Sequence, residues 1–137
     1  MAVMDHADIA ILADPAHTAL CVVECQNGVI GPESSVPALA EAAAGGLIPR
    51  VAALAAAARA AGVKVVHCVA MNHPDGWGAN RNARLFGVAR RSKVKQVPGS
   101  AAVEPVAEIG VVEGFDVVVA RFHGLSPTSG TGLDAML

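Results

Sequence analysis

The strongest constraint on the fold is a set of three short valine-rich runs separated by other patterns. They occupy residues 18–24, 63–70 and 115–121, and each is apolar almost throughout rather than alternating. A continuous apolar run is typical of a strand that is buried on both faces of a parallel sheet. Valine also favours strands, because its branched side chain is restricted at χ1 and packs well on a pleated surface. The runs therefore predict three parallel strands.

Two helical segments lie between the first two runs. Residues 36–44 follow Ser34 and Ser35, which are candidate N-caps, and they end at a pair of glycines. Residues 47–61 end before Gly62 and carry apolar side chains at helical spacing, at Leu47, Val51, Leu54 and Ala58. A strand, a helix and a parallel strand in succession form a right-handed crossover. The pattern predicts an α/β fold.

Length and composition limit the class of protein. The 137 residues are predicted to form one domain, and 53% hydrophobic with 16% charged residues is enough for a core and excludes a disordered chain. No run approaches the roughly 20 apolar residues of a spanning helix, and residues 1–15 lack the basic start of a signal peptide. A net charge of −2 does not favour nucleic acid or an acidic membrane. We expect a cytoplasmic protein with neither partner.

The cysteines do not predict a disulfide or metal framework. Cys21, Cys25 and Cys68 are odd in number, and reduced thiols are the simplest interpretation. Cys21 and Cys25 are four residues apart, which predicts that they share one face of a strand. A metal site would need further ligands, and the flanking sequence offers none. The sequence predicts no metal and no cofactor.

The connection between the second and third runs is long. Residues 72–99 contain several glycines and prolines around residues 80–95, which are predicted to include one short helix. In open α/β sheets, ligands bind at the carboxyl ends of the strands, where this connection begins. We therefore interpret it as a lid or pocket wall. Trp77 lies in it and either covers a ligand or packs with other side chains.

Glu24 and Arg121 end the first and third runs. Parallel strands place their carboxyl ends along one edge, so the two side chains are expected to meet. An acid beside a guanidinium suits a site that transfers a proton and stabilises developing negative charge. A structural ion pair is the alternative.

Two further segments offer candidate residues. The loop at residues 121–134 is rich in glycine and hydroxyl groups, and His123 within it is either an acid–base group or a surface histidine. A basic cluster lies between the second and third runs. It either attracts an anionic substrate or serves no substrate and forms a solvated helix face or an oligomer contact. A solvated face or contact is the commoner case. The members of the cluster are Arg81, Arg84, Arg90, Arg91, Lys93 and Lys95.

Two motifs together resemble the isochorismatase-like (cysteine hydrolase) family. They are VVECQNG at residues 22–28 and VVVARFHGLSPTSGTGLD at residues 117–134, and the resemblance extends from about residue 18 onward. It implies a three-layer α/β/α sandwich with a parallel sheet. It also implies hydrolysis of a small amide, carbamoyl or vinyl-ether substrate by a triad of aspartate, lysine and cysteine, in a protein that assembles into homo-oligomers.

This sequence departs from the family pattern at each triad position. Glu24 stands in place of the aspartate and Arg121 in place of the lysine, and arginine cannot give up a proton. The cysteines do not match the nucleophile. The resemblance implies a hydrolase with Glu24 as acid or base and Arg121 as electrostatic support. We expect Asn27, Trp77, His123 and Ser126 to bind substrate. The alternative is a non-catalytic member that binds a ligand or serves assembly.

The resemblance also carries an expectation about the extent of the domain. In this family further strands pair with the first strand, and the nucleophile follows a helix that is expected to begin near Leu133. We therefore expect residues 1–137 to form a domain truncated at its C-terminus, or one whose sheet a partner completes. A bare central strand would expose unpaired backbone groups.

Overall fold

A computed structural model describes residues 6–137, so residues 1–5 of the stretch considered for a signal peptide lie outside the described residues. The sheet contains β1 (Ala19–Val23), β2 (Lys64–Met71) and β3 (Val117–Phe122), in the order β1-β2-β3. Both pairings are parallel. His67 of β2 lies opposite Val22 of β1 on one side and opposite Val118 of β3 on the other. The prediction of three parallel strands is confirmed.

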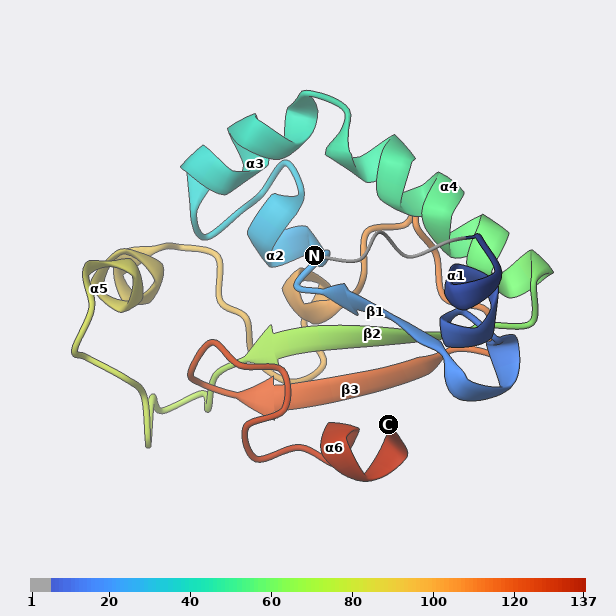
Figure 1. The fold of residues 1–137 in the computed structure, drawn as a ribbon. Coiled ribbons are helices and arrows are strands. Elements are labelled where there is room, and N and C mark those ends of the chain that lie inside the picture. The colour runs from blue at the N-terminus through green and yellow to red at the C-terminus, as the bar shows by residue number, and fades with distance from the viewer. Residues whose placement is uncertain (1–5) are drawn as a thin grey trace, which may run out of the picture.

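The helices lie on both sides of this sheet, as Figure 1 shows. On one side are α3 (Pro37–Ala44) and α4 (Leu47–Ala60), and on the other is the short α6 (Leu133–Met136). The predicted α/β/α layering is confirmed. The remaining elements are α1 (His6–Leu12), η1 (Pro15–His17), α2 (Asn27–Ile30), α5 (Arg84–Arg91) and η2 (Ala101–Val103). Of these, α5 lies beyond the carboxyl ends of β2 and β3.

The core on the α4 side depends on small side chains. Ala55 is fully buried, and Ala52 and Ala58 pack against the same cluster. Val51 packs there as well. By contrast, Leu47 and Leu54 are 40% and 56% exposed. The predicted apolar face is therefore confirmed at Val51 and Ala58 and wrong at the two leucines.

The two N-terminal cysteines do not share a strand face, contrary to the sequence prediction. Cys21 packs in the cluster under α6, whereas Cys25 packs against the cluster under α4. The reason lies at Glu24, which follows the end of β1 and has a left-handed φ of 54°. This turn of the backbone ends the alternation of a strand, so a spacing of four no longer returns to the same face.

The predicted serine caps of α3 are also corrected. The N-cap residue is Val36, and no side chain caps the helix. Instead Ser34 Oγ accepts a hydrogen bond from Val36 N at 2.9 Å and donates one to Val29 O at 2.6 Å. Ser35 Oγ donates to Gly28 O at 3.0 Å. The two serines thus stabilise the turn between α2 and α3.

Within residues 6–137, no single helix is both long and apolar enough to cross a membrane. Together α3 and α4 have sufficient length and apolar composition, but they are bent by 70° at the break between them.

Gly28 in α2 is required by a close approach of two segments. A Cβ atom at this position would lie 2.8 Å from Ala102 O and 2.9 Å from Gln96 Cγ. We expect Gly28→Ala to lower the free energy of unfolding by about 1–3 kcal/mol, because overpacking displaces backbone. Gly132→Ala is the control, since φ is −83° there and nothing lies within 4 Å. Equal urea midpoints for the two variants would contradict the prediction.

Candidate functional site

Glu24 and Arg121 meet above the middle strand of the sheet. Arg121 Nη2 donates to Glu24 Oε1 at 2.5 Å, although the two residues come from opposite edges of the sheet and β2 lies between them. The Arg121 side chain is 2% exposed and that of Glu24 is 27% exposed. The expectation that the two side chains meet is confirmed.

The guanidinium of Arg121 is not fully paired. Nη2 also donates to Gly124 O at 3.0 Å, but the buried Nε and Nη1 atoms have no hydrogen-bond partner among the described residues. An unsatisfied buried donor costs about 1–3 kcal/mol, and more when it is charged. Such groups are rare in folded proteins, and each calls for an explanation. Two of the three guanidinium nitrogens are therefore left without an acceptor in the described part of the chain.

Strained backbone occurs at this edge. Glu24 and His123 are the non-glycine residues with positive φ in the described chain, at 54° and 59°, and each directly follows a strand. A left-handed conformation costs a non-glycine residue on the order of 1–3 kcal/mol and persists where the surroundings fix it, often at functional sites. Both strained residues lie at the same edge as the Glu24–Arg121 pair.

A cavity of about 450 Å³ lies at this edge and is lined by both members of the pair. Its size is within the usual range of small-molecule sites. Apolar side chains from several elements supply much of the wall, among them Val29, Leu39, Met71, Leu85, Phe86 and Val97. Polar and charged side chains supply much of the rest, among them Asn72, Asp75, Asn80, Arg81, Arg90, Lys95 and His123. A chamber with both apolar and charged walls suits a small organic ligand that carries polar groups.

His123 lines the cavity, and contacts hold its ring in place. Nε2 donates to Trp77 O at 2.7 Å, and Nδ1 lies 3.0 Å from Oδ1 of the Asn72 amide. Beside it, Gly124 N donates to Asn80 Oδ1 at 2.8 Å. These contacts attach the end of β3 to the segment after β2. Because both ring nitrogens have partners, the orientation of the His123 ring is fixed.

The other three residues expected to bind substrate do not line the cavity. Trp77 is 73% exposed and its ring meets the edge of His73, with centroids 5.5 Å apart. Asn27 Nδ2 donates to Ala101 O, and Ser126 Oγ contacts Thr128 Oγ1 at 2.9 Å. Their roles in substrate binding stay predictions.

A buried amide network under the site was not anticipated. Gln26 is fully buried, donates to Ala70 O at 2.9 Å and accepts from Ala70 N at 2.7 Å. It also donates to Gln96 Oε1, and Gln96 Nε2 donates to Ser35 Oγ at 2.6 Å. The network attaches the segment after β1 to the end of β2, and so positions Glu24. The one feature of the sequence that could have indicated this network is Gln26 in the VVECQNG motif.

The cysteines do not supply a nucleophile to the cavity. None of the three lines it. Burial, followed by the neighbouring Cys21, raises the pKa of Cys68 to about 11, and burial followed by Glu24 raises the pKa of Cys25. A raised pKa keeps a thiol protonated and unreactive at neutral pH. Within residues 6–137, no group of three potential metal ligands is close enough to hold an ion.

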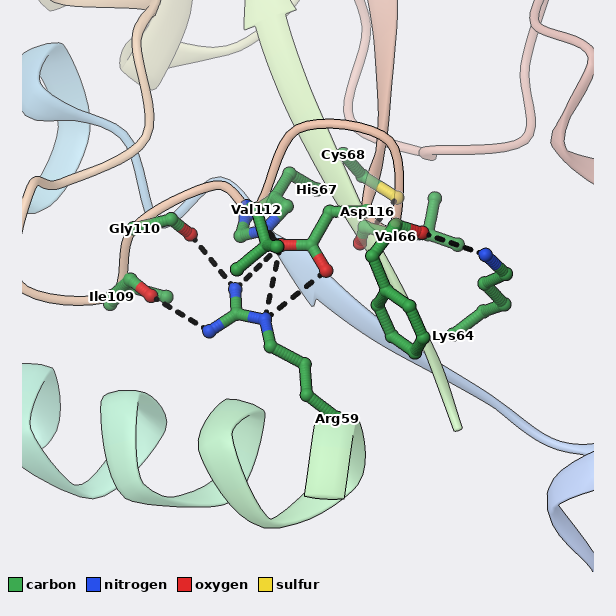
Figure 2. A network of polar contacts seen from close by, with 10 residues as sticks. Arg59, Lys64, Val66, His67, Cys68, Ile109, Gly110, Val112 and Asp116 are labelled. Atoms are coloured by element: carbon green, nitrogen blue, oxygen red, sulfur yellow. Dashed lines mark hydrogen bonds and ion pairs between the residues drawn. The ribbon is translucent and has the colours of Figure 1, made fainter. Parts of the chain in front are cut away.

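A second charged cluster lies away from the cavity, at the amino end of β3 (Figure 2). Asp116 Oδ2 accepts from Arg59 Nη2 at 2.6 Å, from Val112 N at 2.9 Å and from His67 Nε2 at 3.1 Å. The Asp116 side chain is fully buried and that of His67 is 1% exposed. The cluster attaches α4 to β2 and β3, so its role is structural.

Comparisons with known proteins agree with this architecture. An isochorismatase family protein from Desulfovibrio vulgaris subsp. vulgaris str. Hildenborough is 26% identical with a TM-score of 0.67; the match covers 88% of this chain and 60% of that one. An N-carbamoylsarcosine amidase from Thermoplasma acidophilum is 23% identical, with a TM-score of 0.58 and coverage of 88% and 60%. A cysteine hydrolase from Pseudomonas syringae pv. phaseolicola 1448A is 23% identical, with a TM-score of 0.62 and coverage of 90% and 54%.

This chain thus spans about three fifths or less of the length of these structures. A search of curated proteins found no match. The family model that describes the isochorismatase domain matches residues 18–137, which is most of the chain, and the chain therefore belongs to the isochorismatase family.

Proposed function

We propose that this chain carries the acid–base part of a hydrolytic site that acts on a small amide, carbamoyl or vinyl-ether substrate. The observation that carries the proposal is the Glu24–Arg121 pair, which lines a cavity of about 450 Å³ at the carboxyl edge of the sheet. The amidase and the cysteine hydrolase with the same fold support hydrolysis as the reaction class.

Glu24 is the proton-transferring group in this proposal. Its side chain is 27% exposed, and only Oε1 is held by Arg121, so Oε2 is available to a ligand. As a base it accepts a proton from an attacking group, and as an acid it donates one to a leaving group or to a vinyl carbon. Its fixed position reduces the reorganisation that proton transfer requires.

Arg121 supports the charge on the substrate. It cannot donate its proton, so it acts as a fixed cation that orients Glu24. Arg121 also lines the cavity. Its positive charge therefore stabilises a substrate oxygen that becomes negative during the reaction.

A ligand-binding role without catalysis is the second candidate. Two observations favour it: one carboxylate oxygen of Glu24 is already bound by Arg121, and no cysteine lines the cavity. In that case the same chamber binds a small molecule, and the ion pair serves only to fix the edge of the sheet.

Turnover and binding measured together separate the two candidates. The chain is incubated with primary amides, N-carbamoyl amino acids and enol ethers, and NMR follows both the products and the broadening of ligand signals. We expect product from at least one set, at a rate that falls when a non-hydrolysed binder of the cavity is added. Specific binding without any product would support the ligand-binding role and contradict hydrolysis.

A further inference from the structure

A small recess adjoins the main cavity beside α5. It has a volume of about 50 Å³, and its wall consists of Asn80, Arg81, Phe86, Gly87 and Arg90. Four of these five residues, all except Gly87, also line the main cavity. The helix that contributes to this wall lies beyond the carboxyl ends of β2 and β3 (Figure 1). A ligand in the cavity is therefore within reach of the recess.

The two arginines of the recess carry uncompensated charge. Ion pairs in the described part of the chain join Arg121 to Glu24 and join Asp116 to Arg59 and His67, so neither Arg81 nor Arg90 has a carboxylate partner there. Lys95, which lines the main cavity but not the recess, donates through Nζ to Arg90 O at 2.9 Å. Two guanidinium groups are thus left to act on a ligand.

The chemistry of the recess favours a particular anion. Its two guanidinium groups match a planar carboxylate in geometry, because each can donate two parallel hydrogen bonds to it. The recess also adjoins the main cavity, so the carboxylate and the rest of the ligand can occupy adjoining spaces.

We propose that Arg81 and Arg90 form a subsite for the carboxylate of a ligand whose apolar part occupies the main cavity. The inference rests on the proposed function in that it takes the cavity as the place where substrate binds. It assigns the substrate an acidic group remote from the reacting bond. Phe86, which lines both the recess and the cavity, provides apolar contact between these two ends.

The structure divides the basic segment into two groups. Arg81, Arg90 and Lys95 line the cavity, whereas Arg84, Arg91 and Lys93 do not line the cavity or the recess. Arg81, Arg90, Arg84 and Arg91 are all exposed, so replacement by glutamine leaves the core intact. The double variant Arg84→Gln/Arg91→Gln therefore removes the same charge as Arg81→Gln/Arg90→Gln without touching the subsite.

The test compares benzoate with benzamide, two probes of equal size that differ in charge. Isothermal titration calorimetry measures both with the wild-type chain and the two double variants at physiological salt. We expect the wild-type chain to bind benzoate about 2- to 30-fold more tightly than benzamide, as contacts with two exposed guanidinium groups imply. Arg81→Gln/Arg90→Gln should abolish this preference, whereas Arg84→Gln/Arg91→Gln should keep it.

Three results would overturn the subsite. The first is a preference for benzoate that survives Arg81→Gln/Arg90→Gln. The second is an equal loss of that preference in both double variants, which would indicate only a general positive field. The third is absence of benzoate binding to the wild-type chain. Because calorimetry needs no turnover, the subsite and the proposed function fail separately. If the chain prefers benzoate but hydrolyses nothing, the subsite is supported and the hydrolytic function is not. If it hydrolyses a neutral substrate but shows no preference for benzoate, the hydrolytic function is supported and the subsite is not.

Discussion

The Asp116→Asn variant is expected to lose about 3–5 kcal/mol of unfolding free energy, because it removes one partner of a buried ion pair. Asp116 is fully buried and Arg59 is 18% exposed. In the variant an amide NH₂ replaces one carboxylate oxygen, although both oxygens accept from Arg59. His67 Nε2 loses its anionic partner as well, and its Nδ1 already has no hydrogen-bond partner. Urea titration followed by circular dichroism measures the loss.

Glu113→Gln is the matched control for this prediction. It removes the same charge three residues away at an exposed position outside any ion pair of the described chain, so its urea midpoint should stay within experimental error of the wild type. A midpoint for Asp116→Asn as close to the wild type as that of Glu113→Gln would show that the buried cluster contributes nothing to stability.

The stabilisation by Asp116 also has a defined pH dependence. Burial alone would raise its pKa, but hydrogen bonds from Arg59, Val112 and His67, together with the charge of Arg59, outweigh burial and lower the pKa from 3.8 to about 2. The unfolded chain therefore binds this proton more readily than the folded one. The stabilisation is fully present above the unfolded value of 3.8 and is lost as the pH falls through about 2, so the difference from Asp116→Asn should shrink over this window.

The sequence predicted the parts of the fold that depend on local pattern. The valine-rich runs identified all three strands, and the rule that parallel strands end at one edge brought Glu24 and Arg121 together correctly. These predictions succeed because strand character and connection handedness are determined by short segments of chain.

Contacts between distant segments were beyond such reasoning. Gln26 and Gln96 are 70 residues apart, and Arg59 and Asp116 are 57 apart, so no periodic pattern relates them. Trp77 shows a related limit: its loop suggested either a cover over a ligand or packing, and the sequence could not indicate that the residue is 73% exposed and contacts His73. Loop geometry depends on backbone conformations, such as the left-handed one of His123, that residue type alone does not specify for a non-glycine residue.

Replacing Glu24 by glutamine is expected to lower kcat by about 10²–10⁴-fold on whichever substrate the wild-type chain hydrolyses, because an amide cannot transfer the proton. Stability should change far less. Glutamine keeps the carbonyl oxygen that accepts the hydrogen bond from Arg121 Nη2, and the 27% exposure of the side chain lets water replace part of the lost charge interaction. Steady-state kinetics with a urea titration of the same sample separates the two effects.

Two further variants decide whether the loss concerns proton transfer. Glu33→Gln removes a carboxylate at an exposed position outside the cavity and should leave kcat unchanged. Glu24→Asp keeps the carboxyl group but shortens its reach by one methylene, so it should retain more activity than Glu24→Gln while showing a weaker contact with Arg121. If Glu24→Gln hydrolyses substrate at the wild-type rate, Glu24 has no part in the chemistry, and its pairing with Arg121 is a structural contact at the edge of the sheet.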